Sequence, residues 1–238
     1  MNKLTKAGIA GLFLSLTAVL ASCGSSSETS SDTVAVTADV FPVTVGDLTL
    51  DAQPTRIISL SPTATEMLYA IGAGSQVVAV DEYSNYPAEA VALGTPLSGF
   101  EPNIEAISGY TPDLVIISYD PGSLVEQLST LDIPVFVAGA AMSIENVYEQ
   151  IEQLGVLTGN SQKAIEVSKT LQTGIEEAVA SVQFSEPPLS YYYELDNTYY
   201  SVTSNTFIGQ IFNLFGMRNI ADNVESGNDY PQLSAEVI

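Results

Sequence analysis

The side chains that could do chemistry in this chain are mainly carboxylates and phenols. Its 238 residues include 28 Asp and Glu, 12 Tyr and one Cys, with no His and no Trp. Without imidazole, the usual zinc and copper sites, histidine-ligated haem and Ser-His-Asp or Cys-His nucleophiles are excluded. Glu194 and Asp196, two residues apart, are the local acid pair that a carboxylate-based hydrolase or a calcium site could use, although an exposed strand end gives the same pattern. We therefore expect no catalytic residues and no metal site.

The single cysteine, Cys23, closes the sequence Leu-Ala-Ser-Cys after two lysines and an apolar run that is short for a membrane span. This pattern predicts a secretory signal at 1–22. It also resembles the bacterial lipobox, in which the thiol receives diacylglycerol and becomes the new N-terminus. We expect a lipidated, Ser-rich tether at 23–42 and a lipid-anchored protein at the cell surface or on the periplasmic face of the bacterial membrane. The alternative is a free cysteine in an ordinary signal peptide.

The charge balance excludes one class of partner. Removing residues 1–22 takes away two lysines and no acid, which leaves four basic against 28 acidic residues and a formal charge of −24. Such a charge argues against binding nucleic acid, and it leaves the lipid anchor as the only membrane contact. With 46 % apolar and 14 % charged residues, the composition is nevertheless that of a globular protein.

Buried strands alternate with helices in the first half of the chain. Nearly continuous apolar strands are expected at 56–60, 77–80, 113–118 and 135–138, with helices after 63 and near 87–92, 103–108 and 123–131. Thr63 and Glu66 have capping-box spacing, and an edge strand is expected within 43–50. The alternation predicts an α/β fold with a mainly parallel sheet covered on both faces, forming an N-terminal lobe at 43–140.

The rest of the chain divides into a helical region and a second α/β unit. Residues 143–182 are helical in pattern with a break at Gly159-Asn160, which predicts a helical connector at 141–185. A partial C-terminal lobe at 186–238 has an expected strand at 189–195 and a helix at 207–215. Ser234 has the features of an N-cap, and the sequence ends after the first turn of the helix that would follow it. We expect from this that the chain is C-terminally truncated.

Four blocks, in order, resemble the periplasmic-binding domain that serves iron-siderophore, haem and vitamin B12 ABC importers. They begin at residues 56, 93, 199 and 230 and read RIISLSPTATEMLYAIGAGSQVVAVDEYSNYPAEA, LGTPLSGFEPNIEAISGYTPDLVIIS, YYSVTSNTFIGQIFNLFGMRNIAD and YPQLSAEVI. The resemblance is greatest to the cobalamin-binding type. It implies two α/β lobes bridged by a long helix, a class III periplasmic-binding-protein-like arrangement, with the ligand between the lobes and the second lobe incomplete.

The resemblance also assigns roles to individual residues. Glu105 and Glu236 match positions where one glutamate on each lobe docks into the permease, although each could equally be an acid favoured by a helix N-terminus. The positions that line the ligand cleft in cobalamin-binding members correspond to aromatic residues here, for which ordinary burial is the alternative. They are Tyr83, Phe100, Tyr119, Tyr200 and Tyr230.

The few basic residues bear on the cargo. Arg56, Lys163, Lys169 and Arg218 are the only ones after the signal, and none is an obvious clamp for an anion, which favours a neutral or cationic cargo. A corrinoid or a hydroxamate ferric siderophore fits, and haem is possible through tyrosinate ligation.

These observations predict a monomeric substrate-binding lipoprotein with no cofactor of its own, which delivers cargo to an ABC permease and its ATPase. The alternatives are an anchored sensor or adhesion protein and a carboxylate-based hydrolase.

Overall fold

The computed structural model describes residues 39–238, which belong to one compact unit. Cys23, the predicted signal peptide at 1–22 and most of the predicted tether lie outside the described residues. Between 39 and 238, no helix combines the length and the apolar character needed to cross a membrane.

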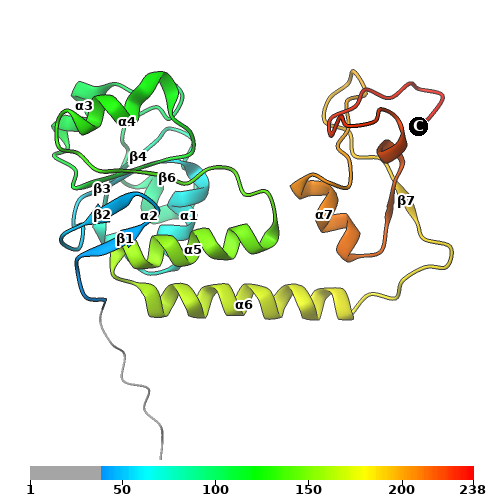
Figure 1. Cartoon of the computed structure of the whole chain (residues 1–238), viewed down its shortest axis with the longest axis horizontal. Helices are drawn as coiled ribbons and strands as arrows, with labels where there is room; N and C mark the ends of the chain where they lie inside the picture. The colour runs from blue at the N-terminus through cyan, green and yellow to red at the C-terminus, as the bar shows by residue number, and fades with distance from the viewer. Residues whose placement is uncertain (1–38) are drawn as a thin grey trace, which may run out of the picture. The chain divides into compact units, whose positions relative to one another are not determined.

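A four-stranded parallel sheet lies at the centre of residues 43–140, the predicted N-terminal lobe (Figure 1). Its strands are β3 (Ile57–Leu60), β4 (Val77–Val80), β5 (Leu114–Ile117) and β6 (Val135–Val137), in the order β4-β3-β5-β6. Side chains alternate between two hydrophobic clusters, so that Leu114 and Ile116 belong to one and Val115 and Ile117 to the other. Both faces of β5 are therefore buried, which explains its unbroken apolar sequence and confirms the predicted parallel sheet.

Helices cover the two faces of this sheet. Residues of α1 (Pro62–Ala70) and α5 (Ile144–Thr158) belong to one cluster, and residues of α3 (Ile104–Gly109) and α4 (Leu124–Ser129) to the other. Shorter helical segments lie in the connections. They are η1 (Ala73–Gln76), α2 (Ala88–Val91) and η2 (Pro121–Ser123).

Two local predictions for this lobe were wrong. The segment 43–50 is not one strand but an antiparallel hairpin of β1 (Val43–Val45) and β2 (Leu48–Leu50), in which Gly46 takes a φ of 56° that glycine tolerates. Helix α1 is capped by Ser61 rather than by the Thr63-Glu66 box, because the helix already begins at Pro62. The Ser61 side chain accepts a hydrogen bond from the Ala64 N–H.

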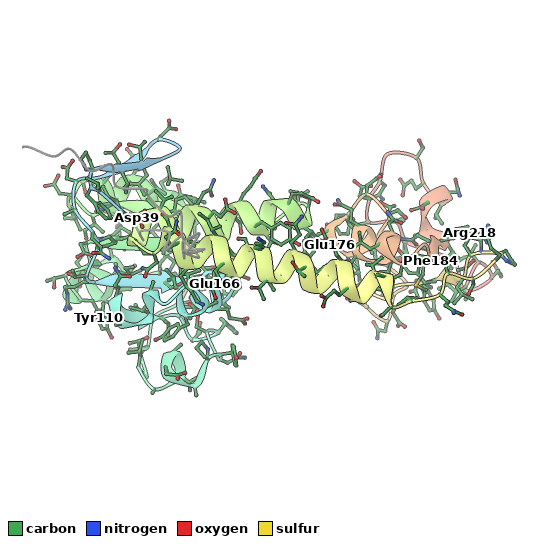
Figure 2. All side chains as sticks on the ribbon, turned by 90° about the horizontal axis from the view of Figure 1, so that it is seen from below. Asp39, Tyr110, Glu166, Glu176, Phe184 and Arg218 are labelled. Carbon is green, nitrogen blue, oxygen red and sulfur yellow. The ribbon has the colours of Figure 1, made fainter. Side chains whose placement is uncertain are left out.

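The predicted helical region consists of α5 and α6 (Ser161–Ala180), which lie side by side (Figure 1). The break falls at Gly159-Asn160 as predicted, and Gly159 has a φ of 72° that ends α5. A Cβ on Gly155 would lie 2.4 Å from Cβ of Ala164, so small residues permit this close approach of the two helices. Figure 2 shows Glu166 and Glu176 along α6.

The last part of the chain is less regular than the sequence suggested. The strand expected at 189–195 is only β7 (Ser190–Tyr191), because its pairing with β8 (Arg218–Asn219) extends over two residues. Helix α7 (Phe207–Leu214) forms as predicted, and η3 (Ile220–Asn223) follows β8. Ser234 starts a turn closed by the Val237 N–H, not a helix, since a single turn has little stability of its own.

Candidate ligand-binding site

Three of the five aromatic residues that the sequence singled out lie together. The ring centroids of Tyr83 and Phe100 are 5.5 Å apart and nearly perpendicular, and those of Phe100 and Tyr119 are 6.3 Å apart. The three side chains are 54 %, 62 % and 43 % exposed, respectively. A contiguous aromatic surface that remains open to water is typical of a binding site rather than of a core. We call these three residues the aromatic trio.

The parallel sheet places the trio at its carboxyl edge. Tyr83 follows β4, Tyr119 follows β5, and Phe100 lies on the loop that leads from α2 to α3. Because β3 is followed by β4 on one side of the sheet and its neighbour β5 is followed by β6 on the other, this edge contains a topological switch point between β3 and β5. Ligands of open α/β sheets bind at such points.

Gly99 holds the loop that carries Phe100 against the sheet. A Cβ at this position would lie 2.7 Å from the carbonyl oxygen of Leu60, the last residue of β3, so only glycine fits there. The Ser98 hydroxyl accepts hydrogen bonds from the N–H groups of Phe100 and Glu101, at 3.3 and 3.2 Å. The position of Phe100 is therefore fixed by contacts on both sides of Gly99.

A buried polar network lies under this edge. Asp81, directly after β4, is 4 % exposed, and its Oδ1 is 2.5 Å from the Ser84 hydroxyl. That hydroxyl is 2.9 Å from Thr65 Oγ1, which is 2.9 Å from Ser59 Oγ. The Ser59 hydroxyl donates to the Ser61 carbonyl oxygen at 3.1 Å. The chain of contacts connects β4 to the start of α1.

Hydroxyl groups provide the donors of this network. The Ser84 hydroxyl donates to Oδ1 of Asp81, and the Thr65 hydroxyl donates to Ser59 Oγ. Burial raises the pKa of Asp81 and the charge of Glu82 adds to this, against the lowering effect of the Ser84 hydrogen bonds. Burial is the largest of these effects, so the pKa of Asp81 is raised on folding.

The other two aromatic candidates lie on a different pair of segments. Tyr200 forms an antiparallel bridge with Gln232, and the Ser201 N–H donates to the Pro231 carbonyl oxygen at 3.0 Å. Tyr230 is on the same segment as Gln232, so it is close to Tyr200 along the paired backbones. Both side chains are exposed, and within residues 39–238 neither takes part in an aromatic ring pair. Their place in the ligand site stays a prediction.

The two proposed docking acids differ in their setting. Glu105 is exposed in the first turn of α3, where the Asn103 side chain caps the helix by accepting from the Ala106 N–H at 2.9 Å. Glu236 is also exposed, but it belongs to the turn after Ser234 rather than to the first turn of a helix. The helix-start geometry expected for both is therefore found only at Glu105.

The acid pair Glu194 and Asp196 has a local structural explanation. Oδ1 of Asp196 accepts hydrogen bonds from the Thr198 N–H and hydroxyl, at 2.8 and 2.5 Å, and these bonds lower the pKa of Asp196. The carboxylate thus closes a turn. Across the described part of the chain, no group of three or more His, Cys, Asp or Glu side chains is placed to hold a metal ion.

Sequence reasoning missed Asp81 and Gly99. The available signal was position along the chain, since Asp81 directly follows the strand β4 and Gly99 directly precedes Phe100.

The sequence also gave no indication of where the hollows in the surface lie. Phe100 lines one of about 280 Å³ with Ile104 and Leu124, while a larger one of about 720 Å³ lies elsewhere and contains none of the predicted ligand residues.

Comparison with known proteins identifies the family. Residues 57–238 match the model of the periplasmic binding proteins. The chain belongs to the periplasmic binding protein family. This is a family of solute-binding proteins and not of enzymes, as the sequence predicted.

Three relatives show how far the similarity extends. A cobalamin-binding protein of Halobacterium salinarum is 35 % identical over 210 residues, which cover 83 % of this chain and 56 % of the relative. An uncharacterized ABC transporter substrate-binding lipoprotein of Bacillus subtilis is 29 % identical and aligns over 91 % of this chain and 73 % of its own length. The crystal structure of the periplasmic vitamin B12 binding protein of Vibrio cholerae is 30 % identical with a TM-score of 0.61, over 77 % of this chain and 71 % of that one.

The chain spans about half the length of the Halobacterium relative, since the alignment covers 56 % of that protein.

Proposed function

We propose that this protein is the extracytoplasmic substrate-binding lipoprotein of an ABC importer and that it captures a corrinoid. The observation that carries the proposal is the exposed aromatic trio at the carboxyl edge of the sheet, in a chain of the periplasmic binding protein family. A flat ring packs well on a macrocycle, and a tyrosine hydroxyl adds a polar contact at its edge.

A corrinoid is favoured over the other cargoes of the proposal. The relatives from Halobacterium and Vibrio are described as binding cobalamin and vitamin B12. Haem and anionic siderophores need cations for their carboxylates, and none of the four basic side chains in residues 39–238 belongs to the loops that carry the trio. Ferric hydroxamate siderophores and haem are the alternative cargoes.

Delivery to the membrane completes the proposal. Cys23 would carry the lipid that holds the protein to the membrane, which agrees with the description of the Bacillus relative as a lipoprotein. Glu105 and Glu236 would dock a monomer onto basic pockets of a permease that works with an ATPase. Exposed carboxylates suit this role because they speed and orient the encounter with a positive surface.

The direct test is retention of cargo after dialysis. The unlipidated protein starting at Gly24 is equilibrated separately with cyanocobalamin, haemin and a ferric hydroxamate, and bound cargo is read by absorbance. We expect saturable retention of cyanocobalamin. Retention of haemin alone, or of the hydroxamate alone, would show that this compound and not a corrinoid is the cargo. Retention of none of the three by a folded sample would overturn the importer proposal in favour of a sensor or adhesion role.

The docking role has its own test. Glu105→Ala should leave corrinoid binding unchanged and should reduce corrinoid uptake by cells that depend on this protein. Glu126→Ala is the matched control, because Glu126 is likewise an exposed acid in the first turn of a short helix of the same lobe. Equal loss of binding and uptake in Glu105→Ala, or equal uptake by both variants, would exclude a docking role for Glu105.

A further inference from the structure

Each residue of the aromatic trio has an acidic neighbour in the sequence. Glu82 precedes Tyr83, Glu101 follows Phe100 and Asp120 follows Tyr119, and all three acids are exposed. The ring contacts that bring the trio together therefore also gather three carboxylates around it. Consecutive Cα atoms are about 3.8 Å apart, so the backbone positions of each acid and its ring lie well within one Debye length, which is about 8–10 Å at ordinary salt.

Within the described part of the chain, these acids form no ion pair with a basic side chain. In residues 39–238, the ion pair that forms is Lys163 with Glu166, on α6. Arg56 lies at the opposite end of the sheet from the trio, just before β3, where its guanidinium donates to the carbonyl oxygens of Tyr110 and Thr111.

The other two basic side chains are equally unavailable. Lys169 is on α6, and Arg218 (labelled in Figure 2) is on β8 with its guanidinium donating to the Ser190 hydroxyl. The potential at the trio is thus set by carboxylates whose charge is not offset nearby.

We infer that the site selects corrinoids that carry net positive charge over neutral or anionic ones, and that Glu82, Glu101 and Asp120 are the residues that determine this preference. The inference rests on the proposed function, since it concerns the same site. The acids act through the field at the ligand and need not touch it. Corrinoids suit such a preference because their net charge changes with the axial ligand while the macrocycle stays the same.

Coulomb's law sets the expected size of the effect. A carboxylate about 8 Å from a single positive charge in a water-like medium changes affinity by about twofold. Three such carboxylates give about tenfold at low salt, and screening at physiological ionic strength reduces this to about threefold.

The experiment compares aquacobalamin, which carries one positive charge, with cyanocobalamin, which is neutral and has the same macrocycle and nucleotide. Dissociation constants are measured by equilibrium dialysis at mildly acidic pH, at low and high salt. The protein starting at Gly24 has no histidine and no cysteine, so neither imidazole nor thiolate can displace the axial water of aquacobalamin. The comparison therefore reports charge.

Two triple variants isolate the three acids. In the test variant Glu82→Gln, Glu101→Gln and Asp120→Asn are combined, and the asparagine introduced by the last change retains a side-chain oxygen that can accept from the Val125 N–H, as Oδ1 of Asp120 does. The control variant changes net charge equally on α5 and α6, away from the trio. Its substitutions are Glu152→Gln, Glu176→Gln and Glu177→Gln.

We expect the wild-type protein and the control variant to bind aquacobalamin about three- to tenfold more tightly than cyanocobalamin, with a preference that shrinks in salt. The test variant should lose the preference and still bind cyanocobalamin. Equal affinity for the two corrinoids in the wild-type protein, or a preference that persists in the test variant, would overturn the inference. Failure to bind either corrinoid would instead overturn the proposed function.

Discussion

Replacing Gly99 by alanine tests how the site is positioned. The added Cβ would lie 2.7 Å from the carbonyl oxygen of Leu60 and 3.1 Å from Oδ2 of Asp81. A comfortable carbon–oxygen contact is about 3.3 Å, so the loop must move by about 0.6 Å away from the end of β3. The obstacle is the backbone of an interior strand of the sheet, which cannot give way as a flexible side chain could.

The expected cost has two parts. Overpacking of this kind destabilises a protein by about 1–3 kcal/mol. The shift also moves Phe100, the next residue, relative to Tyr83 and Tyr119. Since an aromatic pair contributes about 0.5–1.5 kcal/mol, we expect corrinoid affinity to fall by about three- to tenfold.

Both parts can be measured on one sample. Denaturant unfolding can be followed by tyrosine fluorescence, because the chain has no tryptophan, and binding by equilibrium dialysis with cyanocobalamin. Gly109→Ala, at the end of α3, is the matched control, since a Cβ there meets nothing within 4 Å. If Gly99→Ala matched this control in stability and affinity, the argument that Gly99 fixes Phe100 would be refuted.

Two other substitutions test the framework of the lobe. Gly155→Ala should destabilise the protein by about 1–3 kcal/mol in denaturant unfolding, despite the better helix propensity of alanine. The reason is that the added Cβ would lie 2.4 Å from Cβ of Ala164. A stabilised variant would show that α5 and α6 separate freely. Asp81→Asn should gain stability relative to the wild-type protein as pH rises. The pKa of Asp81 is raised on folding, so the stabilising contribution of the Asp81 carboxyl is complete below its pKa in the unfolded chain. That contribution is lost as pH rises through the pKa of Asp81 in the folded protein. Unfolding free energies that differ by a constant amount from about pH 3 to about pH 8 would contradict a pKa of Asp81 that is raised on folding.

The sequence predicted the sheet well because the signal was local and strong. Unbroken apolar runs such as Leu114–Ile117 are stable only when both faces of a strand are covered, and the helices between them supply the cover. The break at Gly159 could also be predicted from the sequence, since glycine commonly ends a helix by adopting the left-handed backbone conformation. These features depend on neighbours in the chain.

The remaining features depend on residues that are distant in the sequence. The capping choice at Ser61 could not be separated from Thr63 without the backbone, and the short pairing of β7 depends on β8, which lies well beyond it in the chain. The role of Gly99 requires the position of Leu60, on another strand. Resemblance to a family pointed to the aromatic residues, but only the folded sheet brings Tyr83, Phe100 and Tyr119 together.

Binding of a corrinoid by the aromatic trio is tested by comparing Phe100→Ala with Tyr86→Ala in equilibrium dialysis against cyanocobalamin. Phe100 contacts both other rings of the trio, whereas Tyr86 is a similarly exposed aromatic residue of the same lobe outside it. We predict that Phe100→Ala weakens binding by at least about tenfold, as expected for a central aromatic contact, and that Tyr86→Ala binds within about twofold of the wild-type protein. Undiminished binding by a folded Phe100→Ala variant would show that the aromatic trio is not the corrinoid site.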